Sequence, residues 1–324
     1  MKKSPHTLPD ETGVKAPGLP AVSVGFLSYD CDDSLLQQVC RALGVAASRY
    51  GGEIEVIAVN TGSESNHQRL KNHLATALAE DGGALLPCRV VDAAENNIST
   101  GRNLLLDAAK YPIICMFDDD EIVSPDWIEA LINTKLEHGA AVVAGPVACD
   151  FPKSSPRWMR ALDLHESRGR ETGQRLDYCS SCNVLLDRDC LGGLRFNRRF
   201  GKSGGEDLDF FLRATRLGHK LVWSSDALVS ETIPKDRASL RWLAQRFMKQ
   251  GQIYVDVMVT QGVIRSSLVH RLRAIPVFIL ALVLAAVFAL LDPRQSAKWL
   301  KRALTNLGKF TPSTRSIYPQ TEQS

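Results

Sequence analysis

Short apolar runs alternate with stretches of helical periodicity over the first half of the chain. Four runs rich in apolar and β-branched residues predict strands at residues 21–27, 54–59, 88–91 and 113–117. The intervening segments 34–48, 68–78 and 103–109 place apolar residues on one face and predict helices. This βαβαβ order predicts an α/β fold with a mostly parallel central sheet flanked by helices.

The second half of the chain is less regular. A helix is predicted at 125–136, a strand at 140–147 and a short strand at 184–186, with a polar, irregular segment at 150–178. Amphipathic helices are predicted at 206–216 and 239–257. We therefore expect one folded domain over residues 21–260.

Residues 274–291 form an apolar run without a charge. As a helix the run spans roughly 27 Å, close to the hydrocarbon thickness of a bilayer. A buried core helix is the alternative, but little chain remains after it to cover such a helix. Residues 261–324 are therefore predicted to be a membrane-associated region.

Basic residues flank this run on both sides: Arg271, Arg273, Arg294, Lys298, Lys301 and Arg302. Because positive charge resists translocation, a simple span with the tail outside is disfavoured. We expect a shallow or re-entrant element with the tail on the cytosolic face, and a single span remains the alternative.

Composition narrows the classes of function. The 324 residues carry a net charge of +3, which is too near neutral to indicate nucleic acid as the main partner. Residues 1–20 lack the apolar stretch of a secretory signal and are predicted to be a disordered lead-in. The eight scattered cysteines, including the single pair Cys179 and Cys182, indicate core or loop positions rather than a zinc site.

Four acidic residues, Asp118 to Glu121, directly follow the strand predicted at 113–117. Ligands of parallel sheets bind outside the carboxyl ends of the strands. If strand geometry continues, Asp118 and Asp120 point to one side and suit a hard divalent cation, Mg²⁺ or Mn²⁺. A solvated acidic loop is the alternative.

A second acidic group, Glu206 and Asp207, follows two glycines and opens a predicted helix. Carboxylates are favoured at a helix N-terminus by the helix dipole, so a plain cap explains them. A carboxylate base facing a cleft explains them equally well.

Five motifs in order resemble those of the family 2 glycosyltransferases, which have the nucleotide-sugar-binding GT-A fold. They lie at residues 24–30 (VGFLSYD), 55–63 (EVIAVNTGS), 95–103 (ENNISTGRN) and 117–121 (FDDDE), and at 183–187 with 205–207 (NVLLD and GED). The resemblance covers roughly residues 20–250.

The resemblance implies a role for each matching residue. A divalent metal would be bound by Asp120 and Asp118, and Asp207, with Glu206 beside it, would be the catalytic base. The nucleotide-sugar donor would be bound by Ser28, Asn60, Arg102, Asp118 and Asp119. One direct displacement would then invert the anomeric configuration.

Two positions depart from the family pattern. Asn60 stands where an aspartate is usual, and Glu231 stands where a histidine is often found. The motif of processive synthases is also absent, which favours a single sugar addition. The chain thus resembles bacterial exopolysaccharide glycosyltransferases that act on a glycan or lipid-linked acceptor.

The same resemblance implies a location in the cell, and two alternative functions remain open. The enzyme would sit at the inner (cytoplasmic) membrane with its catalytic domain in the cytosol, where the donor is made. A catalytically silent membrane-associated binding subunit of a polysaccharide assembly complex is the alternative. A metal-dependent phosphodiesterase or nuclease is a second rival, although the clustered His and Asp pairs of such sites are missing.

Overall fold

A seven-stranded sheet forms the centre of the fold. The computed structural model describes residues 18–77, 86–264 and 267–311. The strand order is β3 (Cys88–Asp92), β2 (Ile54–Asn60), β1 (Val22–Ser28), β4 (Ile113–Phe117), β8 (Asn183–Asp187), β6 (Val142–Ala144) and β9 (Leu221–Trp223). Only β8 runs antiparallel to its neighbours β4 and β6, so the predicted mostly parallel sheet is confirmed.

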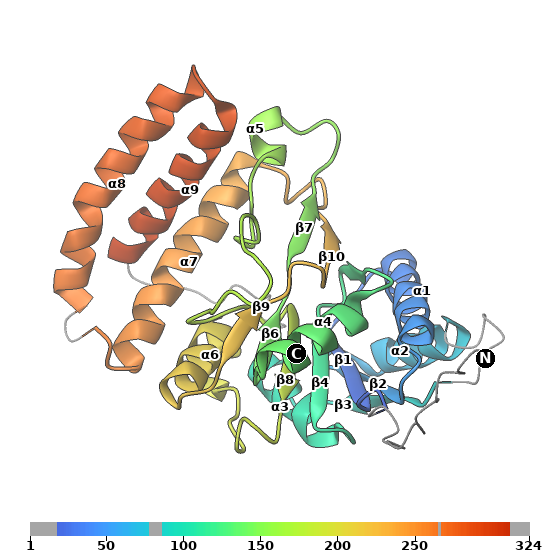
Figure 1. Ribbon diagram of the computed structural model, residues 1–324. Helices are drawn as coiled ribbons and strands as arrows, with labels where there is room; N and C mark the ends of the chain where they lie inside the picture. The colour runs from blue at the N-terminus through green and yellow to red at the C-terminus, as the bar shows by residue number, and fades with distance from the viewer. Residues whose placement is uncertain (1–17, 78–85, 265–266, 312–324) are drawn as a thin grey trace, which may run out of the picture.

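Helices cover both faces of this sheet (Figure 1). One apolar core packs strand residues against α1 (Asp33–Tyr50), α2 (Glu64–Ala77) and α4 (Trp127–His138). The other packs them against α3 (Ile98–Ala108) and α6 (Glu206–Arg216). Burial on both faces explains why β1, β2 and β4 are nearly continuous apolar runs in the sequence.

The α3 helix begins five residues before the predicted start at residue 103. The Asn97 side chain accepts a hydrogen bond from the Thr100 N–H at 3.1 Å and caps the helix. The longer helix places Arg102 on its buried face. Part of the predicted helix at 68–78 and most of the predicted lead-in lie outside the described residues, which omit 78–85 and 1–17.

A second, three-stranded sheet extends beyond the acidic run, in the order β5 (Glu121–Val123), β10 (Val229–Thr232) and β7 (Val147–Asp150). The single strand predicted at 140–147 is wrong. It splits at Gly145 and Pro146 into β6 and β7, which belong to different sheets. A Cβ on Gly145 would lie 2.3 Å from the Ala227 carbonyl oxygen, so this crossing requires glycine.

The segment between β7 and β8 is largely irregular, as predicted. Its α-helix α5 (Arg157–Arg160) is a single turn, and the 3₁₀ turn η1 (Arg198–Phe200) follows β8.

Three long helices end the described chain: α7 (Leu240–Thr260), α8 (Ser267–Ala289) and α9 (Pro293–Phe310). Figure 1 shows α9 lying between α7 and α8. Two glycines let α7 and α9 touch, because a Cβ on Gly251 would lie 2.0 Å from the Thr305 oxygen and one on Gly308 1.9 Å from the Met248 oxygen. The α9 helix is therefore packed closely against α7, which lies within the predicted domain of residues 21–260.

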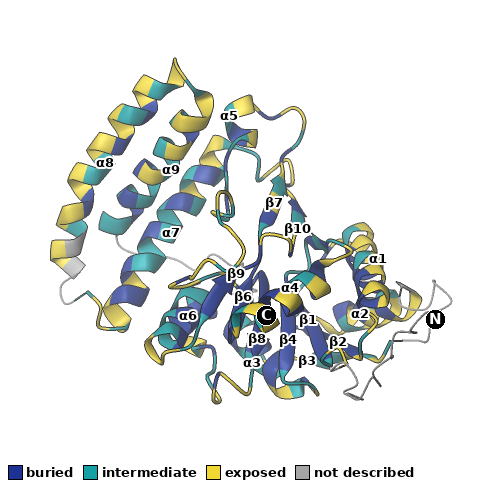
Figure 2. Ribbon diagram, viewed as in Figure 1, coloured by how far each residue is buried: buried dark blue, intermediate teal, exposed yellow. Residues whose placement is uncertain are grey.

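The outer helix α8 is largely exposed, and its segment Arg271–Ala289 is long and apolar enough to cross a membrane (Figure 2). The α8 helix starts seven residues before the predicted apolar run, and its first turns carry Arg271, which is half-buried, and Arg273, which is exposed. Its large exposed side chains are Leu268, Val269, Leu272, Ile275, Ile279, Leu280, Leu282, Val283 and Val287.

Candidate functional site

A cavity of about 1040 Å³ lies outside the carboxyl ends of β1, β2 and β4. Leu27 and Thr61 mark the ends of the first two strands, and the acidic run follows the third. The opposite wall is formed by α7, from Trp242 to Ile253. All four acidic residues from Asp118 to Glu121 line this cavity, as does Arg102.

The acidic run is a tight turn and not a continued strand. β4 ends at Phe117, and the N–H of Glu121, the first residue of β5, donates to the Asp118 carbonyl at 3.1 Å. The expectation that strand alternation aligns Asp118 with Asp120 is therefore wrong. The turn itself brings both carboxylates to the cavity, where Asp118 lies 3.8 Å from Arg102 and Asp120 lies 3.7 Å from Arg237.

Crowding and loss of hydration raise the pKa of every carboxyl in the turn. Burial raises the pKa of Asp118 to about 7 and that of Asp119 to about 6, with neighbouring carboxylates adding to the shift. Burial likewise raises the pKa of Asp120, and raises that of Glu121 well above its usual value. Carboxylate oxygens crowded in this way fit a hard divalent cation such as Mg²⁺ or Mn²⁺.

Arg102 connects this turn to the second acidic group. Its guanidinium lies 2.6 Å from a Glu206 oxygen and 2.7 Å from an Asp207 oxygen. Asp207 also accepts hydrogen bonds from the Ser180 hydroxyl at 3.1 Å and from the Ser181 N–H at 3.3 Å. Four residues predicted from the sequence to act together, Arg102, Asp118, Glu206 and Asp207, thus meet in one place.

The two carboxylates that open α6 have different surroundings. Burial, followed by the charge of Asp207, raises the pKa of Glu206 to about 7, and its second oxygen has no hydrogen-bond partner among the described residues. The Asp207 side chain is 23% exposed, against 7% for Glu206, so only Asp207 is substantially open to solvent. Gly205, at φ +100, makes the turn into this helix.

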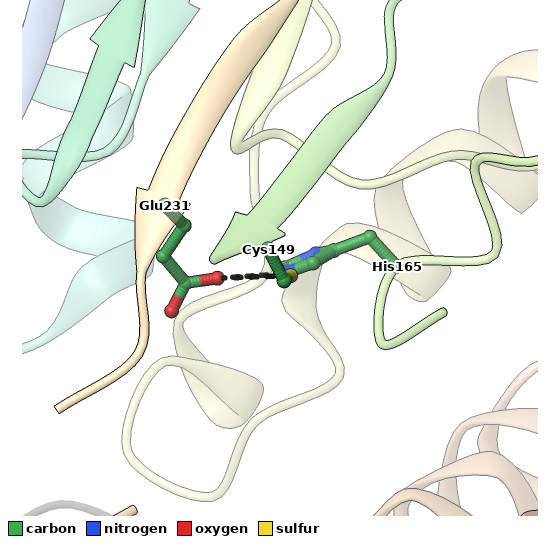
Figure 3. Close-up of side chains that lie close together, drawn as sticks. All are labelled: Cys149, His165 and Glu231. Atoms are coloured by element: carbon green, nitrogen blue, oxygen red, sulfur yellow. Dashed lines mark hydrogen bonds and ion pairs between the residues drawn. The ribbon is translucent and has the colours of Figure 1, made fainter. Parts of the chain in front are cut away.

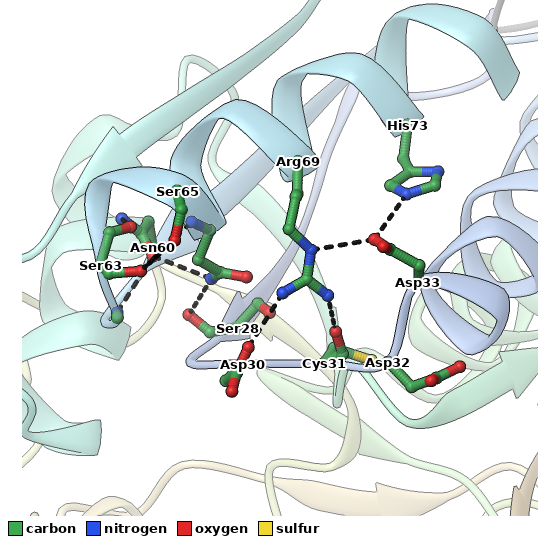
Figure 4. Close-up of polar contacts among 12 residues, drawn as sticks. Ser28, Asp30, Cys31, Asp32, Asp33, Asn60, Ser63, Ser65, Arg69 and His73 are labelled. Carbon is green, nitrogen blue, oxygen red and sulfur yellow. Dashed lines mark hydrogen bonds and ion pairs between the residues drawn. The ribbon is translucent and has the colours of Figure 1, made fainter.

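Ser28 and Asn60 are buried at the strand ends and do not line the cavity. The Asn60 amide donates to Asp92 at 2.9 Å and to the Ser63 carbonyl at 3.0 Å, and its oxygen accepts from Gly62. Asn60 therefore shapes the turn after β2 (Figure 4).

Arg69 of α2 ties down the neighbouring loop after β1. Its guanidinium pairs with Asp30 and Asp33, each at 2.9 Å (Figure 4). These contacts fix the loop that carries Tyr29, which lines the cavity.

Sequence reasoning missed a further group on the cavity wall, formed by Cys149, His165 and Glu231. His165 and Glu231 line the cavity, and their side chains lie 2.9 Å apart (Figure 3). The three residues come from separate segments, so no local sequence pattern predicts that they lie together. The only signal was Glu231 itself, which occupies a position where a histidine is often found.

Comparisons with known proteins found a matching family and relatives by sequence. The family model described as "Glycosyl transferase family 2" matches residues 27–194. The "Succinoglycan biosynthesis protein ExoM" of Rhizobium meliloti (strain 1021) is 33% identical over 254 residues, covering 78% of this chain and 77% of that protein. A "Glucosyl-dolichyl phosphate glucuronosyltransferase" of Haloferax volcanii is 23% identical, covering 61% of this chain and 65% of that protein.

The fold has solved counterparts as well. A crystal structure of GalNAc-T7 with UDP, GalNAc and Mn²⁺ matches with a TM-score of 0.52 at 13% identity, covering 72% of this chain and 48% of that one. At this identity the likeness concerns the fold, which is the GT-A fold. Together with the family match over half of its length, these findings show that the chain belongs to glycosyl transferase family 2 and is a glycosyltransferase.

Proposed function

We propose that this enzyme transfers one sugar from a nucleotide-sugar donor to a hydroxyl of a glycan or lipid-linked acceptor, with inversion at the anomeric carbon. The observation that carries the proposal is that the acidic turn and Arg102 line one cavity and that Arg102 is paired with Asp207. The name of the ExoM relative supports a place in exopolysaccharide synthesis.

Asp207 is the proposed base. It is the more exposed of the two α6 carboxylates, and Ser180 and Ser181 hold its orientation. It would take the proton of the acceptor hydroxyl as that oxygen attacks the sugar. Glu206, buried and with a raised pKa, would hold Arg102 in place.

Arg102 is proposed to bind the donor's diphosphate, because its guanidinium already faces Asp118 at the floor of the cavity. In the present state it is paired with Asp207. A bound diphosphate would compete for the guanidinium and leave Asp207 a stronger proton acceptor. Asp119 would contribute to the donor site from the same turn, and Ser28 and Asn60 would support it from behind.

A divalent cation, Mg²⁺ or Mn²⁺, would be held by Asp120 and Asp118. The raised pKa values of the turn and the carboxylate oxygens of both residues support this assignment, as does the Mn²⁺ in the GalNAc-T7 structure. When bound, the cation would neutralise the charge that develops on the departing nucleoside diphosphate.

The C-terminal helices are proposed to seat the enzyme on the cytosolic face of the inner membrane. The exposed apolar side chains of α8 would enter the lipid. The exposed basic residues Arg273, Arg294, Lys298 and Arg302 would contact anionic headgroups.

The packing of α9 supports a helix that lies in the membrane surface rather than one that spans the bilayer. Ser296 of α9 donates to the Ala285 carbonyl of α8 at 2.9 Å, so the two helices are joined. On the other side, Lys301 pairs with Glu166 at 3.1 Å and donates to the Asp163 carbonyl at 2.9 Å. A spanning α8 would have to pull α9 away from these contacts and from α7.

The reaction is tested by a screen of nucleotide sugars with purified full-length protein. A true donor raises the melting temperature only with Mn²⁺ or Mg²⁺ present, because ligands that bind the folded state stabilise it. The same donor should then release nucleoside diphosphate only when lipid-extracted glycan acceptors are added. Donor binding without any acceptor-dependent release would indicate a binding subunit and refute the transferase proposal.

The proposed membrane association of the C-terminal helices is tested in cells and on vesicles. A cysteine introduced at position 318 should resist a membrane-impermeant reagent added to intact cells. Ile279→Asp, on the exposed face of α8, should reduce binding to anionic vesicles, whereas Glu137→Asp, on the distant α4, should not. Efficient labelling from outside would show that the chain spans the membrane.

A further inference from the structure

A thiol, an imidazole and a carboxylate gather on one wall of the cavity. Cys149 lies on β7, Glu231 lies on β10, and His165 lies on the irregular segment between α5 and β8. One ligand-type atom from each lies within 4.8 Å of the other two. None of the three is needed by the transfer reaction proposed above, so the group calls for its own explanation.

Strand register brings two of the three together. β7 and β10 pair in parallel with Cys149 directly beside Glu231, so both side chains leave the same face of the small sheet. The Cys149 sulfur lies 3.7 Å from Oε2 of Glu231, and Nε2 of His165 lies 2.9 Å from the same oxygen. Figure 3 shows the imidazole of His165 directed at the Glu231 carboxylate.

The spacing approaches that of ligands around one small ion. Bond lengths of 2.0–2.3 Å in a tetrahedral zinc site put neighbouring ligand atoms about 3.3–3.8 Å apart. The sulfur–oxygen separation already matches, and the nitrogen–oxygen separation needs to lengthen by only about half an ångström.

The charges of the three groups allow cation binding. Burial alone would raise the pKa of Glu231, but the hydrogen bond from His165 and the nearby Arg246 and Arg237 hold it below its usual value. The group is therefore a carboxylate at neutral pH. Burial and the charge of Glu231 raise the pKa of the Cys149 thiol, so its proton must leave when a cation arrives.

We propose that Cys149, His165 and Glu231 form a binding site for a divalent cation of the zinc class, beside the carboxylates of the acidic turn. Thiolate and imidazole ligands select such borderline-soft cations, whereas carboxylate oxygens alone suit Mg²⁺ and Mn²⁺. A fourth position would face the cavity, because His165 and Glu231 both line it. The ion would tie β7, β10 and the segment before β8 into one wall.

A second cysteine nearby is not part of this site. The Cys182 sulfur lies 3.9 Å from Nδ1 of His165, on the opposite edge of the ring from Nε2. The two nitrogens of one imidazole point away from each other, so a cation on Nε2 is out of reach of Cys182. This makes Cys182→Ser a close control.

Cobalt absorption tests the site in metal-free full-length protein. Co²⁺ should bind with one high-affinity equivalent, giving visible bands of a tetrahedral site and a near-ultraviolet sulfur-to-cobalt band, and Zn²⁺ should abolish both. Cys149→Ser should remove the near-ultraviolet band. His165→Gln and Glu231→Gln should each weaken Co²⁺ binding at least about tenfold, since even outer contacts of metal sites have effects of that size.

Three controls keep the test specific, with the melting temperature of each variant checked without metal. Cys190→Ser removes an exposed cysteine, and Cys182→Ser removes a cysteine near the site. Asp120→Ala removes a ligand of the other proposed site. All three variants should keep the visible bands and the sulfur-to-cobalt band. If Cys149→Ser does not fold, loss of the visible bands in the other two ligand variants carries the proposal. Absence of Co²⁺ binding, or a sulfur band that survives Cys149→Ser, would overturn it.

Discussion

Replacing Arg102 by methionine would remove a cation that joins the acidic turn to α6. The guanidinium is 8% exposed and pairs with Glu206, itself 7% exposed, and with Asp207. Methionine keeps much of the side-chain volume but leaves these carboxylates without their counter-charge. Removing one partner of a buried ion pair costs about 3–5 kcal/mol.

The loss should depend on pH in a defined direction. Glu206 already has a folded-state pKa of about 7, above its ordinary value of 4.5, and loss of Arg102 would raise it further. A carboxyl with a raised folded-state pKa favours folding in its protonated form, so its contribution is complete at low pH and falls as pH rises. The cost of Arg102→Met should therefore be largest near pH 8. It should shrink by about 1.4 kcal/mol per pH unit for each carboxyl that takes up a proton.

Thermal unfolding followed by circular dichroism measures both effects. At pH 8 the expected cost corresponds to a drop in melting temperature of roughly 6–20 °C, and at pH 5.5 to a much smaller one. The control is Arg195→Met, which breaks an exposed pair with Asp107 and should cost less than about 1 kcal/mol at either pH. The reasoning would be refuted if Arg102→Met melts like the wild type at pH 8. It would also be refuted if the drop in melting temperature is the same at pH 8 and at pH 5.5.

Two further substitutions probe the turn and the C-terminal helices. Asp120→Ala should abolish donor binding by calorimetry without lowering the melting temperature, because it removes a repelling carboxylate; unchanged Mn²⁺-dependent turnover would contradict the assignment. Gly308→Ala would place a Cβ 1.9 Å from the Met248 oxygen, so it should cost about 1–3 kcal/mol and weaken vesicle binding. Gly18→Ala meets no atom within 4 Å and should change neither quantity; equal behaviour of the two variants would argue against close contact of α7 with α9.

The central strands could be predicted from the sequence because strands that are buried on both faces consist almost entirely of apolar residues. β1, β2 and β4 read as continuous apolar runs and were placed within a residue or two. The strands β5, β9 and β10 have only three or four residues, too few for periodicity to distinguish them from loops.

Part of the site could likewise be predicted from the sequence, and part could not. The motif resemblance identified Arg102, Asp118, Glu206 and Asp207, which lie up to 105 residues apart and meet in the fold. Strand alternation, in contrast, gave the wrong geometry for the acidic run, because Glu121 folds back to close a turn. The group of Cys149, His165 and Glu231 depends on the register of β7 with β10, which no local pattern encodes.

The most direct test of the account is sugar transfer by Asp207→Asn. Asparagine keeps the shape of the side chain but cannot accept the acceptor's proton, so turnover should fall by about two to four orders of magnitude. Donor affinity, measured by calorimetry with Mn²⁺, should hardly change. Glu206→Gln, the matched change at the neighbouring residue, should retain far more activity. Full transfer by Asp207→Asn, with Glu206→Gln inactive instead, would contradict the assignment of the base.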